Sequence, residues 1–138
     1  MLIWLGCPNC FNKEAQDFNY GEEFTEEILQ KLIELSAPSW ISGISILGGE
    51  PLHPQNREEV LRLISQFKSK YPEKSVWLWT GYLWEDVADD LVDSGIDVVV
   101  DGLFKENLKD LRLKYRGSTN QRVINVKAST KNQVTLYE

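Results

Sequence analysis

Short apolar runs alternate with longer amphipathic stretches along this sequence. The runs have the length of buried strands and cover residues 2–5, 41–47, 76–80, 96–100, 123–126 and 133–137. Apolar side chains three and four positions apart predict helices over residues 25–37, 56–71 and 84–94. This alternation favours one α/β domain over residues 1–138, with mostly parallel strands and right-handed crossovers.

Polar residues mark where the first two helices should begin. Thr25 can cap the first helix, and Phe24 can pack onto Leu29. The second helix is expected to open at Asn56, because residues 56–59 resemble a capping box. A shorter amphipathic segment is expected within residues 105–113.

Residues suited to chemistry follow the carboxyl ends of four predicted strands. Cys7 and Cys10 come after the first strand, residues 48–51 after the second, and residues 80–82 and 101–102 after the next two. Ligands of open α/β sheets bind beyond these strand ends. The four segments are therefore expected to converge on one rim.

The Gly48-Gly49-Glu50-Pro51 turn allows two interpretations. Two glycines let a backbone come close to a ligand, and Glu50 puts a carboxylate at the rim. The turn could then hold an amino group through Glu50 and backbone carbonyls. Alternatively, it is a tight strand-to-loop turn with an exposed acid.

The only two cysteines, Cys7 and Cys10, are separated by two residues. Two thiolates on a short loop suit a soft metal or an iron–sulfur cluster, and thiol redox chemistry is a further possibility. A zinc site would need two more ligands, and His53 is the sole histidine. A lone histidine is more often a surface or packing residue.

Charge and hydropathy narrow the classes of function. The 138 residues carry a net charge of −6, which argues against non-specific binding to nucleic acid. No apolar run reaches the roughly 18–20 residues of a membrane span, and the N-terminal residues make a poor signal peptide, so a cytoplasmic location is expected. A cationic island is either a solvated face or a contact for phosphate or an acidic partner; it comprises Lys109, Arg112, Lys114 and Arg116.

Several motifs occur in an order that matches a known family. Gly48-Gly49-Glu50-Pro51 is shared across radical S-adenosylmethionine enzymes, and Trp79-Thr80-Gly81-Tyr82 and residues 117–121 are typical of one branch. The chain resembles that branch, the anaerobic ribonucleotide reductase activating proteins. The matching segments are residues 6–12, 17–18, 24–25, 41–52, 76–82, 96–104 and 116–123.

The resemblance implies an enzyme with a partial (β/α) barrel, a [4Fe-4S] cluster and S-adenosylmethionine. Three cysteines of the family ligate the cluster, and the cofactor chelates the fourth iron. Reductive cleavage of the cofactor gives a 5′-deoxyadenosyl radical, which leaves a glycyl radical on the large subunit of anaerobic ribonucleotide reductase, the implied partner.

The resemblance also implies roles for individual residues. Cys7 and Cys10 would bind iron, and Phe11 and Asn12 would line the cluster loop. The cofactor's methionine end would be received by the turn after the second strand, namely Gly48, Gly49, Glu50 and Pro51, and Thr80 would also contact the cofactor.

The chain departs from the family pattern near its start. The family has Cys-x-x-x-Cys-x-x-Cys, and one thiolate is absent here. Either Ile3 occupies the first ligand's place, or Cys7 is the first ligand and the middle one is missing; the strand-like residues 3–5 favour the second alignment. Relative to the family, the chain is expected to be shortened at its N-terminus. A non-catalytic family member that binds a partner is therefore the alternative function.

Overall fold

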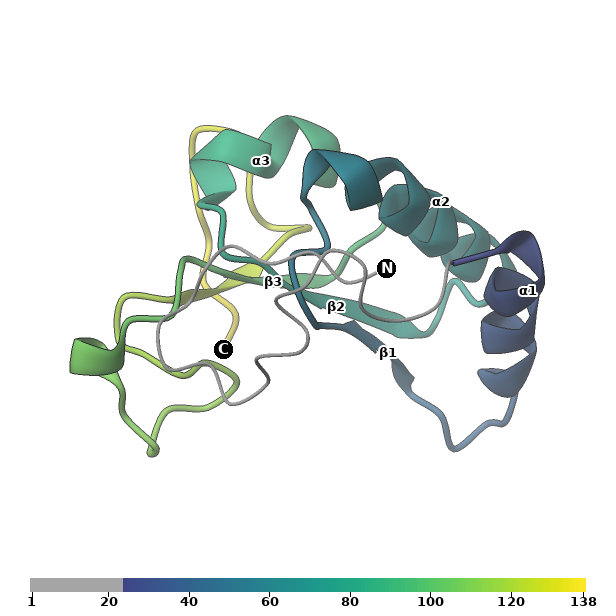
Figure 1. The fold of residues 1–138 in the computed structure, drawn as a ribbon, viewed down its shortest axis with the longest axis horizontal. Coiled ribbons are helices and arrows are strands. Elements are labelled where there is room, and N and C mark those ends of the chain that lie inside the picture. The colour runs from purple at the N-terminus through teal and green to yellow at the C-terminus, as the bar shows by residue number, and fades with distance from the viewer. Residues whose placement is uncertain (1–23) are drawn as a thin grey trace.

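Four strands form one sheet in a computed structural model that describes residues 24–138 (Figure 1). Their order is β1-β2-β3-β4. β1 and β3 both pair parallel with β2, and β4 pairs antiparallel with β3. The strands are β1 Gly43–Ile46, β2 Ser75–Trp79, β3 Val98–Asp101 and β4 Arg122–Asn125.

Three α-helices lie along one side of this sheet (Figure 1). They are α1 Glu26–Leu35, α2 Pro54–Lys70 and α3 Trp84–Leu91, and a short 3₁₀ helix, η2 Glu106–Leu108, follows β3. The helices and the sheet enclose the apolar core. On the sheet side of the core, Leu78, Val99 and Ile124 lie in register on adjacent strands and are completely buried.

The predicted α/β arrangement with mostly parallel strands is confirmed. The described residues form an open sheet, since β1 and β4 lie at opposite ends of the strand order. The strand predicted over residues 2–5 lies outside the described residues. Within residues 24–138, no helix is both long and apolar enough to cross a membrane.

The start of α1 is as predicted, and the start of α2 is not. Thr25 caps α1 by accepting a hydrogen bond from the Ile28 amide at 3.3 Å. α2 begins at Pro54 with His53 as its cap, two residues earlier than the capping box suggested. Proline suits a first helical position because its missing N–H would have no helical partner there. Asn56 instead donates its side-chain amide to the Glu50 carbonyl at 3.1 Å.

One prediction beyond β3 is wrong, and it concerns the last strand. The amphipathic segment expected within residues 105–113 contains the short η2, and after it the Asp110 carboxylate accepts a hydrogen bond from the Arg112 amide at 3.0 Å, which competes with helical hydrogen bonding. Residues 133–137 make isolated bridges, such as Ile124 to Leu136, and no strand. In this segment the Ser129 hydroxyl accepts a hydrogen bond from the Thr135 amide at 2.8 Å, so this amide is not available for pairing with a strand.

Candidate functional site

Three turns meet at the carboxyl ends of the parallel strands, as the sequence predicted. Residues 48–51 come after β1 and residues 80–82 follow β2, while Asp101 is the last residue of β3 and Gly102 follows it. The Thr80 amide donates to the Val100 carbonyl at 3.0 Å, and the Gly102 amide donates to the Tyr82 carbonyl at 3.0 Å. The fourth predicted segment, with Cys7, Cys10, Phe11 and Asn12, lies outside the described residues.

Glu50 connects the first of these turns to the second. One carboxylate oxygen accepts from the Leu52 amide at 2.8 Å and from the Thr80 hydroxyl at 2.7 Å. The other oxygen accepts from the Gly81 amide at 2.7 Å. Because Glu50 is only 2% exposed, the interpretation as an exposed acid is wrong.

Two features of its environment shift the pKa of the Glu50 carboxyl in opposite directions. Burial raises the pKa of the Glu50 carboxyl above its ordinary value. The amides of Gly81 and Leu52 and the Thr80 hydroxyl oppose this shift, because they hydrogen-bond to the charged form. The carboxylate therefore serves as an internal acceptor for three donors.

Thr80 is also turned inward. It is 5% exposed, and its hydroxyl accepts from the Tyr82 amide at 3.1 Å while donating to Glu50. The hydroxyl is thus fully engaged in joining the two turns. Thr80 and Glu50 therefore lie buried beneath the rim and join two of its turns by a hydrogen bond.

The backbone of the first turn offers groups that the side chains do not. Gly48 has a φ of +109°, a conformation that glycine adopts without strain. Within residues 24–138, neither Gly48 nor Gly49 takes part in a hydrogen bond. A cavity of about 400 Å³ adjoins the turn and is lined by Gly49, Glu50 and Pro51 together with residues of β1 and α2.

His53 has a structural role beside this turn. Its Nδ1 atom accepts the Gln55 amide at 3.2 Å at the start of α2. Nδ1 coordination to a metal would displace this capping hydrogen bond. Among residues 24–138, no three His, Cys, Asp or Glu side chains are grouped so as to hold a metal ion.

An ion pair at the end of β3 was not found from the sequence. Asp101 is completely buried and accepts the Trp84 amide at 2.8 Å, the first amide of α3. The Arg122 guanidinium donates to Asp101 and also to Glu85, and these hydrogen bonds raise the pKa of Arg122. The acid after the all-apolar residues 98–100 was the available signal, since a charge at the end of a buried strand needs a partner.

Residues 117–121 close the loop that follows β3. The Gln121 side chain accepts the Gly117 amide at 2.8 Å and donates to the Gly102 carbonyl at 2.9 Å. Asn120 donates to the Leu103 carbonyl at 2.8 Å. This family-typical segment therefore fixes the loop against the rim.

Comparison with known proteins agrees with this picture. A family model described as a 4Fe-4S single cluster domain matches residues 4–124. The anaerobic ribonucleoside-triphosphate reductase-activating protein of Enterobacteria phage T4 is 40% identical over 117 residues, which cover 85% of this chain and 74% of that protein. The chain belongs to this family of activating proteins.

Cellular relatives extend the match. The proteins of the same name from Salmonella typhi and Escherichia coli K12 are 42% and 40% identical over 119 residues, with 83% of this chain and 77% of each relative covered. No solved structure matches. The resemblance inferred from the motifs is confirmed.

The residues of this sequence fit the two groups that the family implies to different degrees. The uncommitted backbone of Gly48 and Gly49 suits the methionine end of S-adenosylmethionine. For a [4Fe-4S] cluster, two cysteines in the whole sequence leave the thiolate set one short of three.

Proposed function

We propose that this chain is an activating enzyme for anaerobic ribonucleotide reductase, working with a [4Fe-4S] cluster and S-adenosylmethionine. When bound, these groups supply one-electron cleavage of a sulfonium, the chemistry needed to start a glycyl radical on the reductase. The proposal is supported by the match, over most of the chain, to relatives named as anaerobic ribonucleoside-triphosphate reductase-activating proteins. The single observation that carries it is the turn after β1, which Glu50 holds open toward a cavity.

The first turn would bind the cofactor through its backbone. A protonated amino group needs acceptors, and the Glu50 carboxylate is buried and directed at three internal donors. The carbonyls of Gly48 and Gly49 remain as acceptors, and Pro51 restricts the exit of the turn. Glu50 and Thr80 would then act as positioning residues that fix these carbonyls.

The cluster would be bound by the segment before residue 24. Cys7 and Cys10 are the proposed thiolate ligands, and Phe11 and Asn12 are proposed to line the loop. The third iron would need a ligand other than cysteine, so a cluster held here should be labile. The proposal includes one domain over residues 1–138, a partial (β/α) barrel, a cytoplasmic location and no direct contact with nucleic acid.

Anaerobic reconstitution with iron and sulfide tests this function. The protein should gain the visible absorption of an iron–sulfur cluster and, with reductant, convert S-adenosylmethionine to methionine and 5′-deoxyadenosine. With the large reductase subunit present, electron paramagnetic resonance should detect a glycyl radical. A Cys7→Ser/Cys10→Ser variant is the control and should show none of these signals. A wild-type protein that takes up no cluster and cleaves no cofactor would refute catalysis.

A second function follows from the missing thiolate. A family member without a complete ligand set could bind the reductase without carrying out chemistry. In that case the chain would co-purify with the large subunit, and reconstitution would yield no cofactor cleavage. Binding and cleavage measured on the same preparation separate the two functions.

A further inference from the structure

The loop between β3 and β4 carries a charge opposite to that of the rest of the chain. Residues 105–116 hold five basic residues and two acidic ones, a net charge of +3. The whole chain carries −6, so all other residues together carry −9. The loop is thus the basic segment of an acidic protein.

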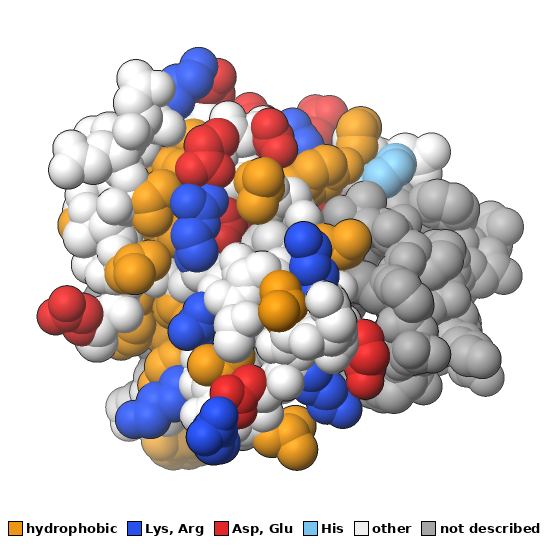
Figure 2. Space-filling model, turned by 90° about the vertical axis from the view of Figure 1, so that its left-hand side faces the viewer, with side chains coloured by type: hydrophobic (Ala, Val, Ile, Leu, Met, Phe, Trp, Pro, Cys, Tyr) orange, Lys and Arg blue, Asp and Glu red, His pale blue; other side chains and the backbone are white. Residues whose placement is uncertain are grey.

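Most of the positive charge of this loop is not neutralised internally. Arg112 pairs with Asp110, and Arg116 donates to backbone carbonyls. Lys105, Lys109 and Lys114 are exposed and form no ion pair with any residue from 24 to 138. Figure 2 looks onto the side of the molecule that holds this loop and shows several Lys and Arg side chains on its lower half.

The loop is held in a defined shape. Its two sides are joined by the Thr119 amide, which donates to the Leu108 carbonyl at 2.9 Å, and by the Asp110 amide, which donates to the Gly117 carbonyl at 3.2 Å. Tyr115 has a φ of +67°, and its carbonyl accepts the Trp79 indole N–H at 2.7 Å. A fixed surface loses less conformational entropy on binding than a mobile one.

Apolar groups accompany the charges. Leu111 is 90% exposed and lies in sequence between Lys109 and Lys114, and Tyr115 is 55% exposed. A polyanion such as RNA binds mainly through its phosphates and would be repelled by the acidic remainder of the chain. An acidic protein surface presents local carboxylates together with apolar groups that can cover Leu111.

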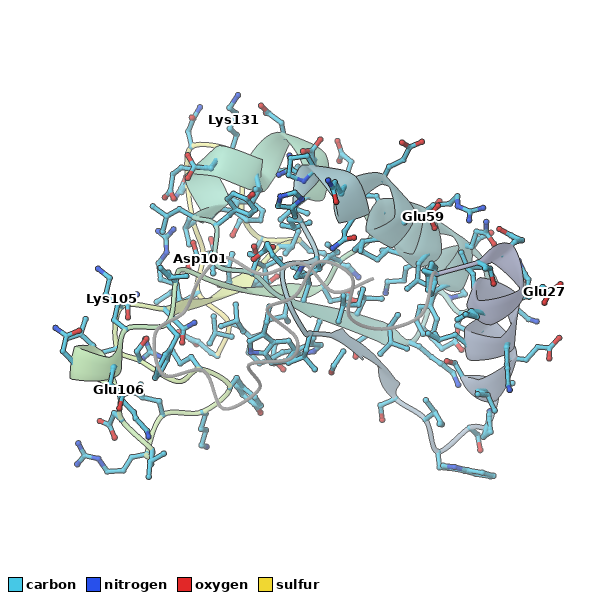
Figure 3. The ribbon with its side chains drawn as sticks, in the orientation of Figure 1. Glu27, Glu59, Asp101, Lys105, Glu106 and Lys131 are labelled. Atoms are coloured by element: carbon cyan, nitrogen blue, oxygen red, sulfur yellow. The ribbon has the colours of Figure 1, made fainter. Side chains whose placement is uncertain are left out.

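We propose that residues 105–116 dock onto an acidic surface of a partner protein. This inference rests on the proposed function, which makes the large subunit of anaerobic ribonucleotide reductase the partner. The loop leaves the carboxyl end of β3 through Gly102, whose amide is bonded to the rim at Tyr82. In Figure 3, Lys105 and Glu106 lie at the end of the molecule opposite Glu27 of α1. Docking at the loop would therefore bring the reductase to the end of the sheet that bears the candidate site and leave α1 uncovered.

Charge reversal on matched lysines tests the docking surface. Lys109→Glu/Lys114→Glu changes the net charge of the loop from +3 to −1, and Lys31→Glu/Lys70→Glu makes the same change in net charge on α1 and α2. The Kd for purified large reductase subunit is measured by calorimetry at about 0.1 M and about 1 M salt, where the screening length is about 10 Å and about 3 Å. The loop variant should bind at least about tenfold more weakly at low salt, and the control within about twofold of wild type.

The outcomes separate the docking inference from the proposed function. High salt should weaken wild-type binding but should not weaken binding of the loop variant, because the variant has no net attraction left for salt to screen. Equal binding by wild type and the loop variant would overturn the docking surface and leave the reductase as partner. No binding by wild type would overturn both. Circular dichroism of each variant confirms that it is folded.

Two further measurements examine the chemistry of the contact. Leu111→Ala should weaken reductase binding a few-fold, because Leu111 is expected to be covered in the complex. A single-stranded RNA of mixed sequence is the polyanion probe and should bind wild type and loop variant equally weakly. RNA binding that depends on Lys109 and Lys114, with no loss of reductase binding in the loop variant, would contradict the proposal.

Discussion

Two buried carboxylates at neighbouring strand ends are stabilised in different ways. Glu50, after β1, accepts hydrogen bonds from two amides and one hydroxyl, all of them neutral donors. Asp101, at the end of β3, faces the Arg122 guanidinium and the first amide of α3. One acid is thus solvated by dipoles and the other is paired with a charge. The difference indicates that the β3 end is anchored by a charge pair, whereas the β1 turn is joined to the turn after β2 by neutral hydrogen bonds.

The largest expected effect comes from removing the charge partner at β3. Arg122→Met leaves the completely buried Asp101 without its cation, and because the Arg122 side chain is 33% exposed the loss of unfolding free energy should be about 3 kcal/mol, the low end for a broken buried pair. Urea denaturation of the purified variant measures the loss. Lys131→Met removes the exposed pair with Asp89 and is the matched control, with an expected loss below about 1 kcal/mol. Equal losses in the two variants would contradict the anchor role.

A smaller loss is expected at the β1 turn. Glu50→Gln keeps the shape of the side chain but puts an N–H₂ group against an N–H or O–H donor, which should cost about 1–3 kcal/mol. The Kd for S-adenosylmethionine should rise as well, because the turn loses its link to β2. Glu58→Gln, on an exposed acid of α2 outside the lining of the cavity, is the control and should change neither quantity. A Glu50→Gln protein of wild-type stability would show that the link is dispensable.

Thr80 offers a finer change to the same link. Thr80→Val removes the hydroxyl that donates to Glu50 and accepts from Tyr82, with an expected loss of about 1–2 kcal/mol. Thr80→Val should also weaken cofactor binding. Thr80→Ser retains the hydroxyl and should bind the cofactor like wild type, apart from the small effect of one methyl group. If both variants lose cofactor affinity equally, packing of the methyl group matters more than the hydrogen bonds.

The smallest effect expected is a dependence of stability on pH. The folded state raises the pKa of Glu50 above the ordinary value of 4.5, so above that pH the folded protein holds this proton more tightly than the unfolded chain does. Unfolding then releases a proton, and stability falls as the pH rises from about 4.5 through the folded pKa. Glu50→Gln lacks this titration, so the stability of wild type relative to the variant should decrease over that interval. A flat or rising difference would mean that the hydrogen bonds outweigh burial.

The sequence predicted which turns meet at the rim better than how these turns are joined. Parallel strands bring their carboxyl ends to one edge, so residues 48–51, 80–82 and 101–102 could be grouped from the strand pattern alone. The orientation of Glu50 could not, because it depends on donors 30 and 31 residues away. The position of the α2 cap was also missed, since Asn56 satisfies the capping pattern but bonds to Glu50.

The same limit explains the errors near the C-terminus. Residues 133–137 alternate apolar and polar side chains as a strand does, but side-chain hydrogen bonds from Ser129 occupy their backbone. Asp110 likewise accepts the Arg112 amide just after η2, where the amphipathic segment does not continue as a helix. Local pattern predicts an element only where no nearby side chain competes for the backbone.

The hydrogen bonds of Glu50 make two motifs that are distant in sequence depend on each other in evolution. Gly-Gly-Glu-Pro and Trp-Thr-Gly-Tyr are separate in the chain, yet the acid of the first is solvated by the hydroxyl and amide of the second. A substitution in either motif leaves a group of the other motif without its hydrogen-bond partner. The losses of unfolding free energy caused by Glu50→Gln and Thr80→Val should therefore not add. Amino-acid replacements in these two motifs are therefore expected to occur in pairs during evolution, separated by long intervals in which neither motif changes.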